Sequence, residues 1–194
     1  MLEEKENSFY AKDRATWRTW LEEHHDSEKS VWLIIYHKDA GMPSVYYPEA
    51  VEEALCFGWI DSKPNKRDDK SYYQFFAKRN PKSNWSKINK QKITYLTEAG
   101  LMAPAGLQMI EIAKQNGTWT ALDEVDNRII PNDLQMALNE NPEALKNFAA
   151  FPPSSHKIIL EWINNAKQVS TRQKRIEETV NLAAQNLKAN HYRQ

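Results

Sequence analysis

The ten residues EALCFGWIDS, Glu53 to Ser62, decide the local fold, because a helix is expected to end there and a strand to begin. Residues 48–57 predict a helix that opens with Pro48, a residue type favoured in the first helical turn. Gly58 is placed to end that helix, since glycine commonly follows a helix C-terminus. The next segment, WIDSKP (residues 59–64), is then expected to be a strand.

The flanking sequence extends this pattern. Residues 13–25 predict a helix with one apolar face, and residues 30–38 predict a buried strand. Residues 71–79 predict a second strand that pairs with residues 59–64 as an antiparallel hairpin. Together these segments predict a small antiparallel sheet packed with helices.

Beyond this region the chain is expected to be helical. Ser83 or Ser86 is expected to cap a helix that Gly100 ends. Further helices are expected to open at Pro104, Pro131, Pro142 and Pro152–Pro153, with residues 118–130 as a linker, and the last helix has a capping-box pattern at Ser170 and Gln173. The predicted fold class is therefore α+β, with an α+β domain over residues 1–120 and a helical domain over residues 121–194.

The bulk composition excludes several classes of protein. The longest apolar run, VWLII (residues 31–35), is far short of the ~18 residues that a transmembrane helix needs. The N-terminal stretch is acidic and polar, unlike a secretory signal, and the single cysteine cannot form an internal disulfide. The sequence contains no zinc-spaced Cys/His cluster and no glycine-rich phosphate loop. We expect a cytoplasmic protein with no membrane insertion, no metal and no cofactor.

Charge is distributed unevenly along the chain, although the net charge is zero. Residues 1–55 carry 12 acidic and 6 basic side chains, residues 56–92 carry 3 acidic and 10 basic, and residues 93–194 carry 11 acidic and 10 basic. The basic middle segment indicates an anionic partner. The alternative is that this segment pairs with the acidic first segment of the same chain.

Cys56 is the first candidate for chemistry, and its surroundings argue against it. A nucleophilic cysteine needs a lowered pKa from a nearby cation or a helix N-terminus. Glu49, Glu52 and Glu53 share a helix face with Cys56, and the thiol lies at the negative end of the helix dipole. A structural thiol on a helix whose glutamates face solvent is therefore expected.

The basic segment offers a better candidate site. Its predicted strands alternate aromatic and basic residues, a composition that stacks on flat ligands or holds anions, unless the sheet is covered on both faces. Asp61 needs a partner if its strand is central, and Arg79 on the neighbouring strand is the natural one. The start of the helix after Ser83 favours an anion, with ordinary capping as the alternative. The candidate ligand-binding residues are Trp59, Asp61, Tyr73, Arg79, Ser83, Trp85, Ser86 and Asn89.

A secondary basic site is predicted near the C-terminus. Arg172 and Arg175 lie in the first turns of a predicted helix, where the helix dipole disfavours cations. Salt bridges within the domain, a bound anion or solvent must offset this effect, and salt bridges are the expected solution.

Four motifs resemble the YdeI/OmpD-associated family, also described as bacteriocin-protection proteins. They are YPEAVEEALCFGWIDS (residues 47–62), KSNWSKIN (82–89), GLMAPAGLQMIEIAKQNGTW (100–119) and ILEWINNAKQVSTRQKRIEETV (159–180). The sequence QFFAKR (residues 74–79) departs from a common family form that reads roughly QRFTPR. The resemblance implies a bacterial protein connected with bacteriocin protection or envelope stress, and it implies no reaction, cofactor or catalytic residue.

Three functions follow as hypotheses. The first is a non-enzymatic protein of stress tolerance that binds an anionic small molecule or a protein partner. The second is a nucleic-acid-binding protein that uses residues 59–92, which would bind with steep salt dependence. The third is an enzyme of unknown reaction with Asp61 as general base. No catalytic residue is assigned under the first hypothesis.

Overall fold

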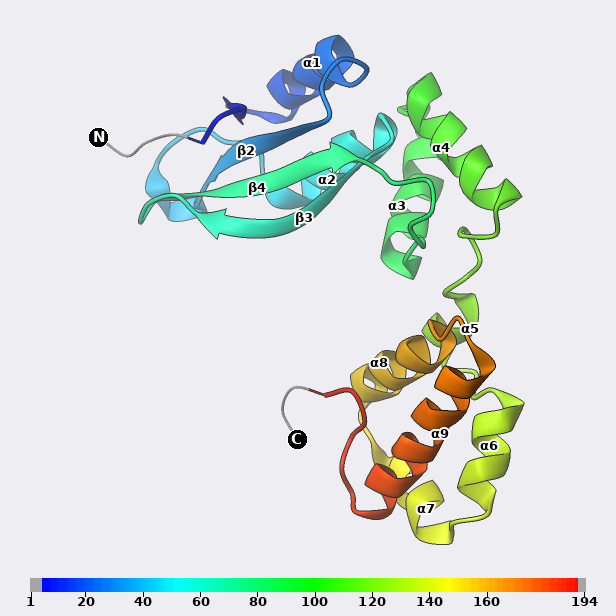
Figure 1. Ribbon diagram of the computed structural model, residues 1–194. Helices are drawn as coiled ribbons and strands as arrows, with labels where there is room; N and C mark the ends of the chain where they lie inside the picture. The colour runs from blue at the N-terminus through cyan, green and yellow to red at the C-terminus, as the bar shows by residue number, and fades with distance from the viewer. Residues whose placement is uncertain (1–4, 192–194) are drawn as a thin grey trace. The chain divides into compact units, whose positions relative to one another are not determined.

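The computed structural model describes residues 5–191, which fall into two compact units divided between Thr120 and Ala121. Unit 1 contains a sheet and helices, and unit 2 is built from helices (Figure 1). The predicted α+β class is confirmed. No helix within the described residues is both long and apolar enough to cross a membrane.

The sheet of unit 1 has four strands in the order β1-β2-β4-β3. Their bounds are β1 Ser8–Tyr10, β2 Ser30–Tyr36, β3 Trp59–Lys66 and β4 Ser71–Lys78. Strands β2, β4 and β3 pair antiparallel, as expected, whereas β1 lies parallel to β2. The sheet is therefore mixed. The sequence interpretation missed β1 because three residues are too few to show an alternating pattern.

Helices α1 (Arg14–His24) and α2 (Tyr47–Cys56) pack against one face of this sheet (Figure 1). That face carries the β2 side chains Val31, Leu33 and Ile35, together with Phe76 of β4. The opposite face carries Trp32, Ile34, Tyr73 and Phe75, as the two-residue alternation of a strand requires.

The start and end of α2 agree with the positions that Pro48 and Gly58 predict. Helix α2 begins one residue before Pro48 and ends at Cys56, and Gly58 has a φ of +73°. A positive φ suits glycine because it has no Cβ. The strand β3 then begins at Trp59, as expected, and extends two residues further than the predicted segment.

Unit 1 also contains a short 3-10 helix, η1 (Lys38–Ala40), and two further α-helices, of which α4 lies very close to the end of α2. The two α-helices are α3 (Lys87–Glu98), capped by the Ser86 side chain, and α4 (Pro104–Gln115). A Cβ built on Gly106 would lie 2.2 Å from the carbonyl oxygen of Cys56. Only glycine permits this approach of the two backbones.

Unit 2 consists of the helices α5 Asp123–Asp126, α6 Asn132–Asn139, α7 Pro142–Ala150, α8 Pro153–Asn164 and α9 Val169–Ala184. Its apolar core includes Leu134, Phe148, Ile159, Leu160, Ile163, Ile176 and Ala183. The expected linker, residues 118–130, does contain the boundary between the two units, but it is not wholly irregular because it includes the short helix α5. The expected capping box at Ser170 and Gln173 is wrong, because Gln168 rather than Ser170 precedes the first residue of α9.

Candidate functional site

The side chain of Arg79 is unusual among the charged groups of residues 5–191, because it is buried and makes no ion pair there. Arg79 follows β4 directly, and its backbone N–H donates to the carbonyl of Gly58 at 3.0 Å. Its guanidinium carbon lies 3.8 Å from the centre of the Trp85 ring, and Nη2 donates to the carbonyl of Asn84 at 2.6 Å. The residue is only 5% exposed.

No acidic side chain among residues 5–191 pairs with Arg79, and its Nε has no hydrogen-bond partner there. Burial lowers the pKa of Arg79 to about 10, since desolvation disfavours the charged form. The group is still cationic at neutral pH. The expected pair of Arg79 with Asp61 is wrong, because the Asp61 carboxylate instead accepts a hydrogen bond from the Tyr47 hydroxyl at 2.6 Å.

Arg79 lines a surface depression of about 400 Å³, called the Arg79 depression below. Residues from the end of α1, the α2–β3 turn, the end of β4 and the start of α4 form its walls: His25, Asp26, Phe57, Gly58, Trp59, Lys78, Pro81, Ala105, Gln108 and Met109. Lys78 supplies a second cation there, although its Nζ donates to the main-chain carbonyl of Asp26 at 2.7 Å. The depression therefore combines apolar walls with an unpaired cation.

Gly58 and Trp59 form part of the wall of this depression, and neither provides a free polar group to a ligand. A Cβ on Gly58 would lie 2.8 Å from Cγ of Met109, so the glycine lets α4 approach the α2–β3 turn. Trp59 is 1% exposed, and its Nε1 donates to the carbonyl of His25 at 3.3 Å. The indole therefore contributes apolar surface, because its one N–H group is already hydrogen-bonded.

The start of α3 shows ordinary capping. The Ser86 hydroxyl accepts from the backbone N–H of Asn89 at 3.4 Å, and the Ser83 hydroxyl donates to the carbonyl of Asn80 at 2.7 Å. Trp85 is buried beneath Arg79. Of the predicted residues in this segment, Trp85 is the one that contacts the Arg79 side chain.

Tyr73 lies apart from Arg79, on the sheet face that α1 and α2 leave free. It packs with Trp32 at 6.2 Å between ring centres, and Trp32 also contacts Phe75 at 4.7 Å. The Nζ of Lys5 lies 3.4 Å from the centre of the Trp32 ring. Of the predicted ligand-binding residues, the structure therefore brings Trp59, Arg79 and Trp85 together and separates Asp61 and Tyr73 from them.

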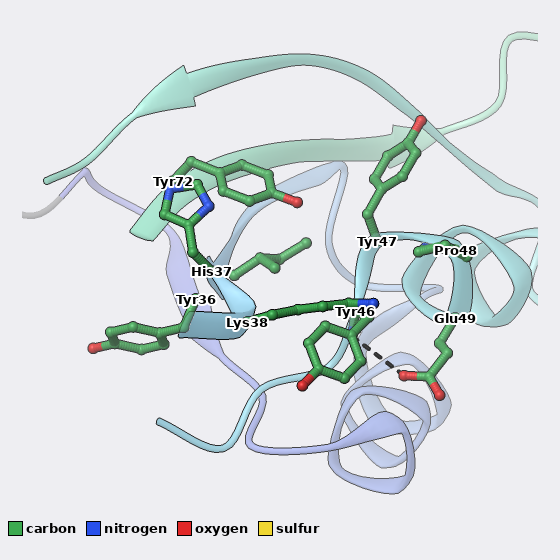
Figure 2. A pocket seen from close by; sticks show the side chains of 9 residues that line it. Tyr36, His37, Lys38, Tyr46, Tyr47, Pro48, Glu49 and Tyr72 are labelled. Carbon is green, nitrogen blue, oxygen red and sulfur yellow. Dashed lines mark hydrogen bonds between the residues drawn. The ribbon is translucent and has the colours of Figure 1, made fainter. Parts of the chain in front are cut away.

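Sequence reasoning missed a group of tyrosines on the other side of unit 1. Tyr46, Tyr47 and Tyr72 line adjoining depressions with His37 and Lys38 (Figure 2). The tyrosine doublets at residues 46–47 and 72–73 were the available signal. Their convergence depends on how β2, β4 and α2 pack together, which the doublets do not reveal.

The acidic face of α2 is only partly solvated, contrary to the expectation of a solvated face, because Glu53 is buried and Glu49 and Glu52 are half-buried. Glu53 is 2% exposed and accepts hydrogen bonds from Nε of Arg14 at 2.5 Å and Nη1 of Arg18 at 2.7 Å. Glu52 pairs with Lys92 of α3 at 2.9 Å. The glutamates therefore hold α2 to its neighbouring helices.

Cys56 lies in the same buried region, and the expected structural thiol agrees with its surroundings. Desolvation, with the nearby Glu53 carboxylate, raises the pKa of the Cys56 thiol to about 11. Arg18 and Arg14 oppose this shift without reversing it. The thiol is protonated at neutral pH and unsuited to nucleophilic attack.

We expect Cys56 to react with a thiol reagent at pH 8 at least about a hundredfold more slowly in the native protein than in the unfolded chain. Burial and a pKa two units above the ordinary value both reduce the thiolate fraction that the reagent can reach. The chain has one cysteine, so the absorbance of the released reagent reports this residue alone. Equal rates in native and unfolded protein would contradict the buried placement.

The same pKa has a consequence at alkaline pH. Because the folded pKa lies above the unfolded one, the contribution of Cys56 to stability is complete below about pH 9 and declines as pH rises towards 11.

Ion pairs neutralise part of the basic segment. Lys66 pairs with Asp69 at 2.8 Å and Arg67 with Asp68 at 3.0 Å, both within the segment, and Lys92 pairs with Glu52 of the acidic first segment. The alternative interpretation, pairing with the acidic first segment, therefore holds for Lys92, whereas Lys66 and Arg67 pair within the basic segment itself. The net positive charge that residues 56–92 could present to a polyanion is therefore smaller than the count of basic residues indicates.

The secondary basic residues of unit 2 are bonded within that unit. Arg172 donates from Nε and Nη2 to the two carboxylate oxygens of Asp133 at 2.6 and 3.0 Å. Arg175 donates to the carbonyl of Trp162 and stacks over the ring of the same residue. This pairing is the expected salt-bridge solution for Arg172, and it lowers the pKa of Asp133.

Fold and site together define a two-unit α+β protein in which a buried arginine at a surface depression has no carboxylate partner among the described residues. The chain belongs to the family of a domain of unknown function, DUF8412, whose family model matches residues 9–109, just over half of the chain. Residues 127–186 match the family described as "Bacteriocin-protection, YdeI or OmpD-Associated", which confirms the suspected resemblance there. The motifs at residues 47–62 and 82–89 lie in the DUF8412 match instead, so the resemblance covers less of the chain than expected.

No similar protein was found among curated proteins, and no similar structure was found among solved structures.

Proposed function

We propose that unit 1 binds a small anion at Arg79 and that the chain acts as a non-enzymatic binding protein in bacteriocin or stress tolerance. One observation carries the binding proposal: a cationic side chain, 5% exposed, has an unbonded Nε and no carboxylate partner among residues 5–191. Burying a charge without a partner is unfavourable, so a bound anion would supply the missing counter-charge.

The chemistry of the Arg79 depression indicates a compact carboxylate or phosphate ester. A guanidinium presents its donors in a planar fork that matches both groups. The apolar walls formed by Phe57, Trp59 and Met109 would contact the uncharged part of the ligand. A volume of about 400 Å³ is within the range of small-molecule sites.

The role in tolerance rests on the family match alone. Residues 127–186 match a family whose description is bacteriocin protection, and this match lies in unit 2. We infer that unit 1 holds the ligand and that unit 2 carries the part common to that family.

Replacing Arg79 by methionine tests the binding site. We expect the free energy of unfolding of the ligand-free Arg79→Met protein to lie within about 1 kcal/mol of the wild-type value. The variant loses the contacts to Trp85 and Asn84, but it also removes an unfavourable unpaired buried charge. We expect wild type to gain thermal stability with phosphate or malonate in a saturable manner, about 1.4 kcal/mol at ten times Kd. The variant should lose this gain. Thermal unfolding and titration calorimetry with these two probes measure both effects.

Arg128→Met is the matched control, since Arg128 is an exposed arginine of unit 2. It should keep the full response to both probes. Equal stabilisation of wild type and Arg79→Met would identify a general salt effect and contradict the proposal. A strongly destabilised Arg79→Met protein, together with no response of wild type to either anion, would assign Arg79 a structural role instead.

An oligonucleotide probe separates the nucleic-acid alternative. Retention of single-stranded DNA that falls steeply with salt and survives Arg79→Met would favour the alternative and contradict a site centred on Arg79.

A further inference from the structure

A second recognition surface lies at the opposite end of β4 from Arg79. Two adjoining depressions of about 450 and 420 Å³ share the side chains of Tyr47 and Tyr72. Tyr46, His37 and Lys38 complete the larger one (Figure 2). We call these five residues and the surface between them the tyrosine cleft. It lies beside the first turn of α2, and the proposed anion site does not include it.

The cleft is open and aromatic. Tyr46 and Tyr47 are each 41% exposed, so part of each aromatic ring faces solvent. Figure 2 shows the ring of Tyr72 reaching over the cleft while the Tyr47 hydroxyl points away from it, where it donates to Asp61. A small ligand in such an open cleft would keep much of its surface in water, whereas tight small-molecule sites enclose most of theirs.

The hydroxyl groups at the cleft are hydrogen-bond donors at neutral pH. Desolvation raises the pKa of Tyr72, and the pKa of Tyr47 is raised to about 12 by desolvation and by its bond to Asp61. The Tyr72 hydroxyl makes no hydrogen bond within residues 5–191. It is therefore a free donor beside an apolar surface.

The chain itself shows the kind of contact this surface makes. Tyr10 packs edge-on against Tyr36 at 5.5 Å between ring centres, and Tyr36 borders the tyrosine cleft. The Tyr10 hydroxyl donates to the main-chain carbonyl of Pro43, in a segment without regular hydrogen-bonded structure. A tyrosine at the edge of this cluster thus already binds an irregular, proline-containing segment through its carbonyl.

We propose that the tyrosine cleft binds a proline-rich segment of a partner protein in the polyproline II conformation, with an acidic residue next to the prolines. A polyproline II helix has no internal hydrogen bonds, so its carbonyls are free to accept from tyrosine hydroxyls while its rings pack on aromatic side chains. Lys38 places a cation at the cleft, with its Nζ 5.3 Å from the Tyr46 ring centre. The Glu49 carboxylate, which also lines the larger depression, already accepts a hydrogen bond from the backbone N–H of Tyr46 at 3.2 Å. Lys38 therefore matches an acidic flank.

The probes are fluorescein-labelled ten-residue peptides, and fluorescence anisotropy with the full chain measures their affinity. One peptide has a run of prolines flanked by two glutamates, the second has the same prolines flanked by two lysines, and the third replaces the prolines by glycine and serine and keeps the glutamates. We expect the acidic proline peptide to bind most tightly. The glycine-serine peptide should show no saturable binding, because it lacks the preformed conformation.

Two variants locate the binding surface. Tyr72→Phe removes only a hydroxyl and should weaken the acidic proline peptide about fivefold, the equivalent of one hydrogen bond. Tyr46→Ala removes an exposed ring and should weaken it about tenfold or more. Tyr95→Ala is the control, since Tyr95 is 58% exposed on α3, and it should leave the affinity unchanged. Far-ultraviolet circular dichroism confirms that each variant is folded.

Equal affinity for the acidic proline peptide and the glycine-serine peptide would show attraction by charge alone and overturn the proposal. Absence of binding to all three peptides, or unchanged affinity in Tyr46→Ala and Tyr72→Phe, would overturn it as well. Arg79→Met should leave peptide affinity intact, so failure at one site is separable from failure at the other.

Discussion

Gly106→Ala is expected to destabilise unit 1 by about 3 kcal/mol, although alanine is the better helix former. Gly106 is buried inside α4, where helix propensity alone predicts a gain of about 0.5–1 kcal/mol on substitution by alanine. A Cβ there would lie 2.2 Å from the carbonyl oxygen of Cys56 and 2.7 Å from its carbonyl carbon. These are backbone atoms that cannot rotate away, so α4 must shift and the clash outweighs propensity.

Denaturant unfolding followed by tryptophan fluorescence measures this effect, because six of the seven tryptophans lie in unit 1. Gly100→Ala is the matched control. Gly100 has a φ of +68° and no atom within 4 Å of a built Cβ, so only backbone strain of about 1–2 kcal/mol applies. A Gly106→Ala protein as stable as wild type, or more stable, would show that α2 and α4 do not approach this closely.

Glu53→Gln is expected to destabilise unit 1 by about 2–3 kcal/mol. Breaking a buried ion pair by removing one partner typically costs about 3–5 kcal/mol, since an unpaired charge is left behind. Arg14 and Arg18 are about one-third exposed, so water can solvate part of their charge, and the expected loss falls below that range. Glutamine preserves the shape of Glu53 but not its charge.

Denaturant unfolding with Glu98→Gln as the control checks this expectation, because Glu98 is an exposed glutamate at the end of α3. The control should stay within about 0.5 kcal/mol of wild type. If Glu53→Gln were no more destabilising than the control, the carboxylate would not be buried among the two arginines. The contrast with Arg79→Met is informative: removing a paired buried charge destabilises, whereas removing an unpaired one is close to neutral.

Local signals in the sequence predicted most of the helices and three of the four strands. Ser86 caps α3, and Gly58 adopts a positive φ just after α2, both as expected. Each depends on residues within one helical turn, so neighbouring sequence contains the needed information. The short strand β1 and the start of α9 escaped prediction, because one has only three residues and the other begins without a side-chain cap.

The candidate site was predictable only in part. The composition of the basic aromatic segment predicted Arg79 as a candidate residue, but the predicted pair of Arg79 with Asp61 is wrong. Strand alternation indicates which face of a sheet a side chain occupies, and it does not indicate which neighbour that side chain contacts. The acidic face of α2 likewise looked solvated, since a helix wheel shows a charged stripe and cannot show that Arg14 and Arg18 from α1 cover it.

Local sequence was sufficient to predict the fold class and the helix-to-strand turn at Gly58, because caps, glycine and hydrophobic spacing act over a few residues. Three features follow from tertiary packing alone: Arg79 is buried without a counter-charge among residues 5–191, Glu53 has two counter-charges, and Tyr46, Tyr47 and Tyr72 line one depression. These outcomes depend on burial and on contacts between residues distant in the chain, and packing sets both.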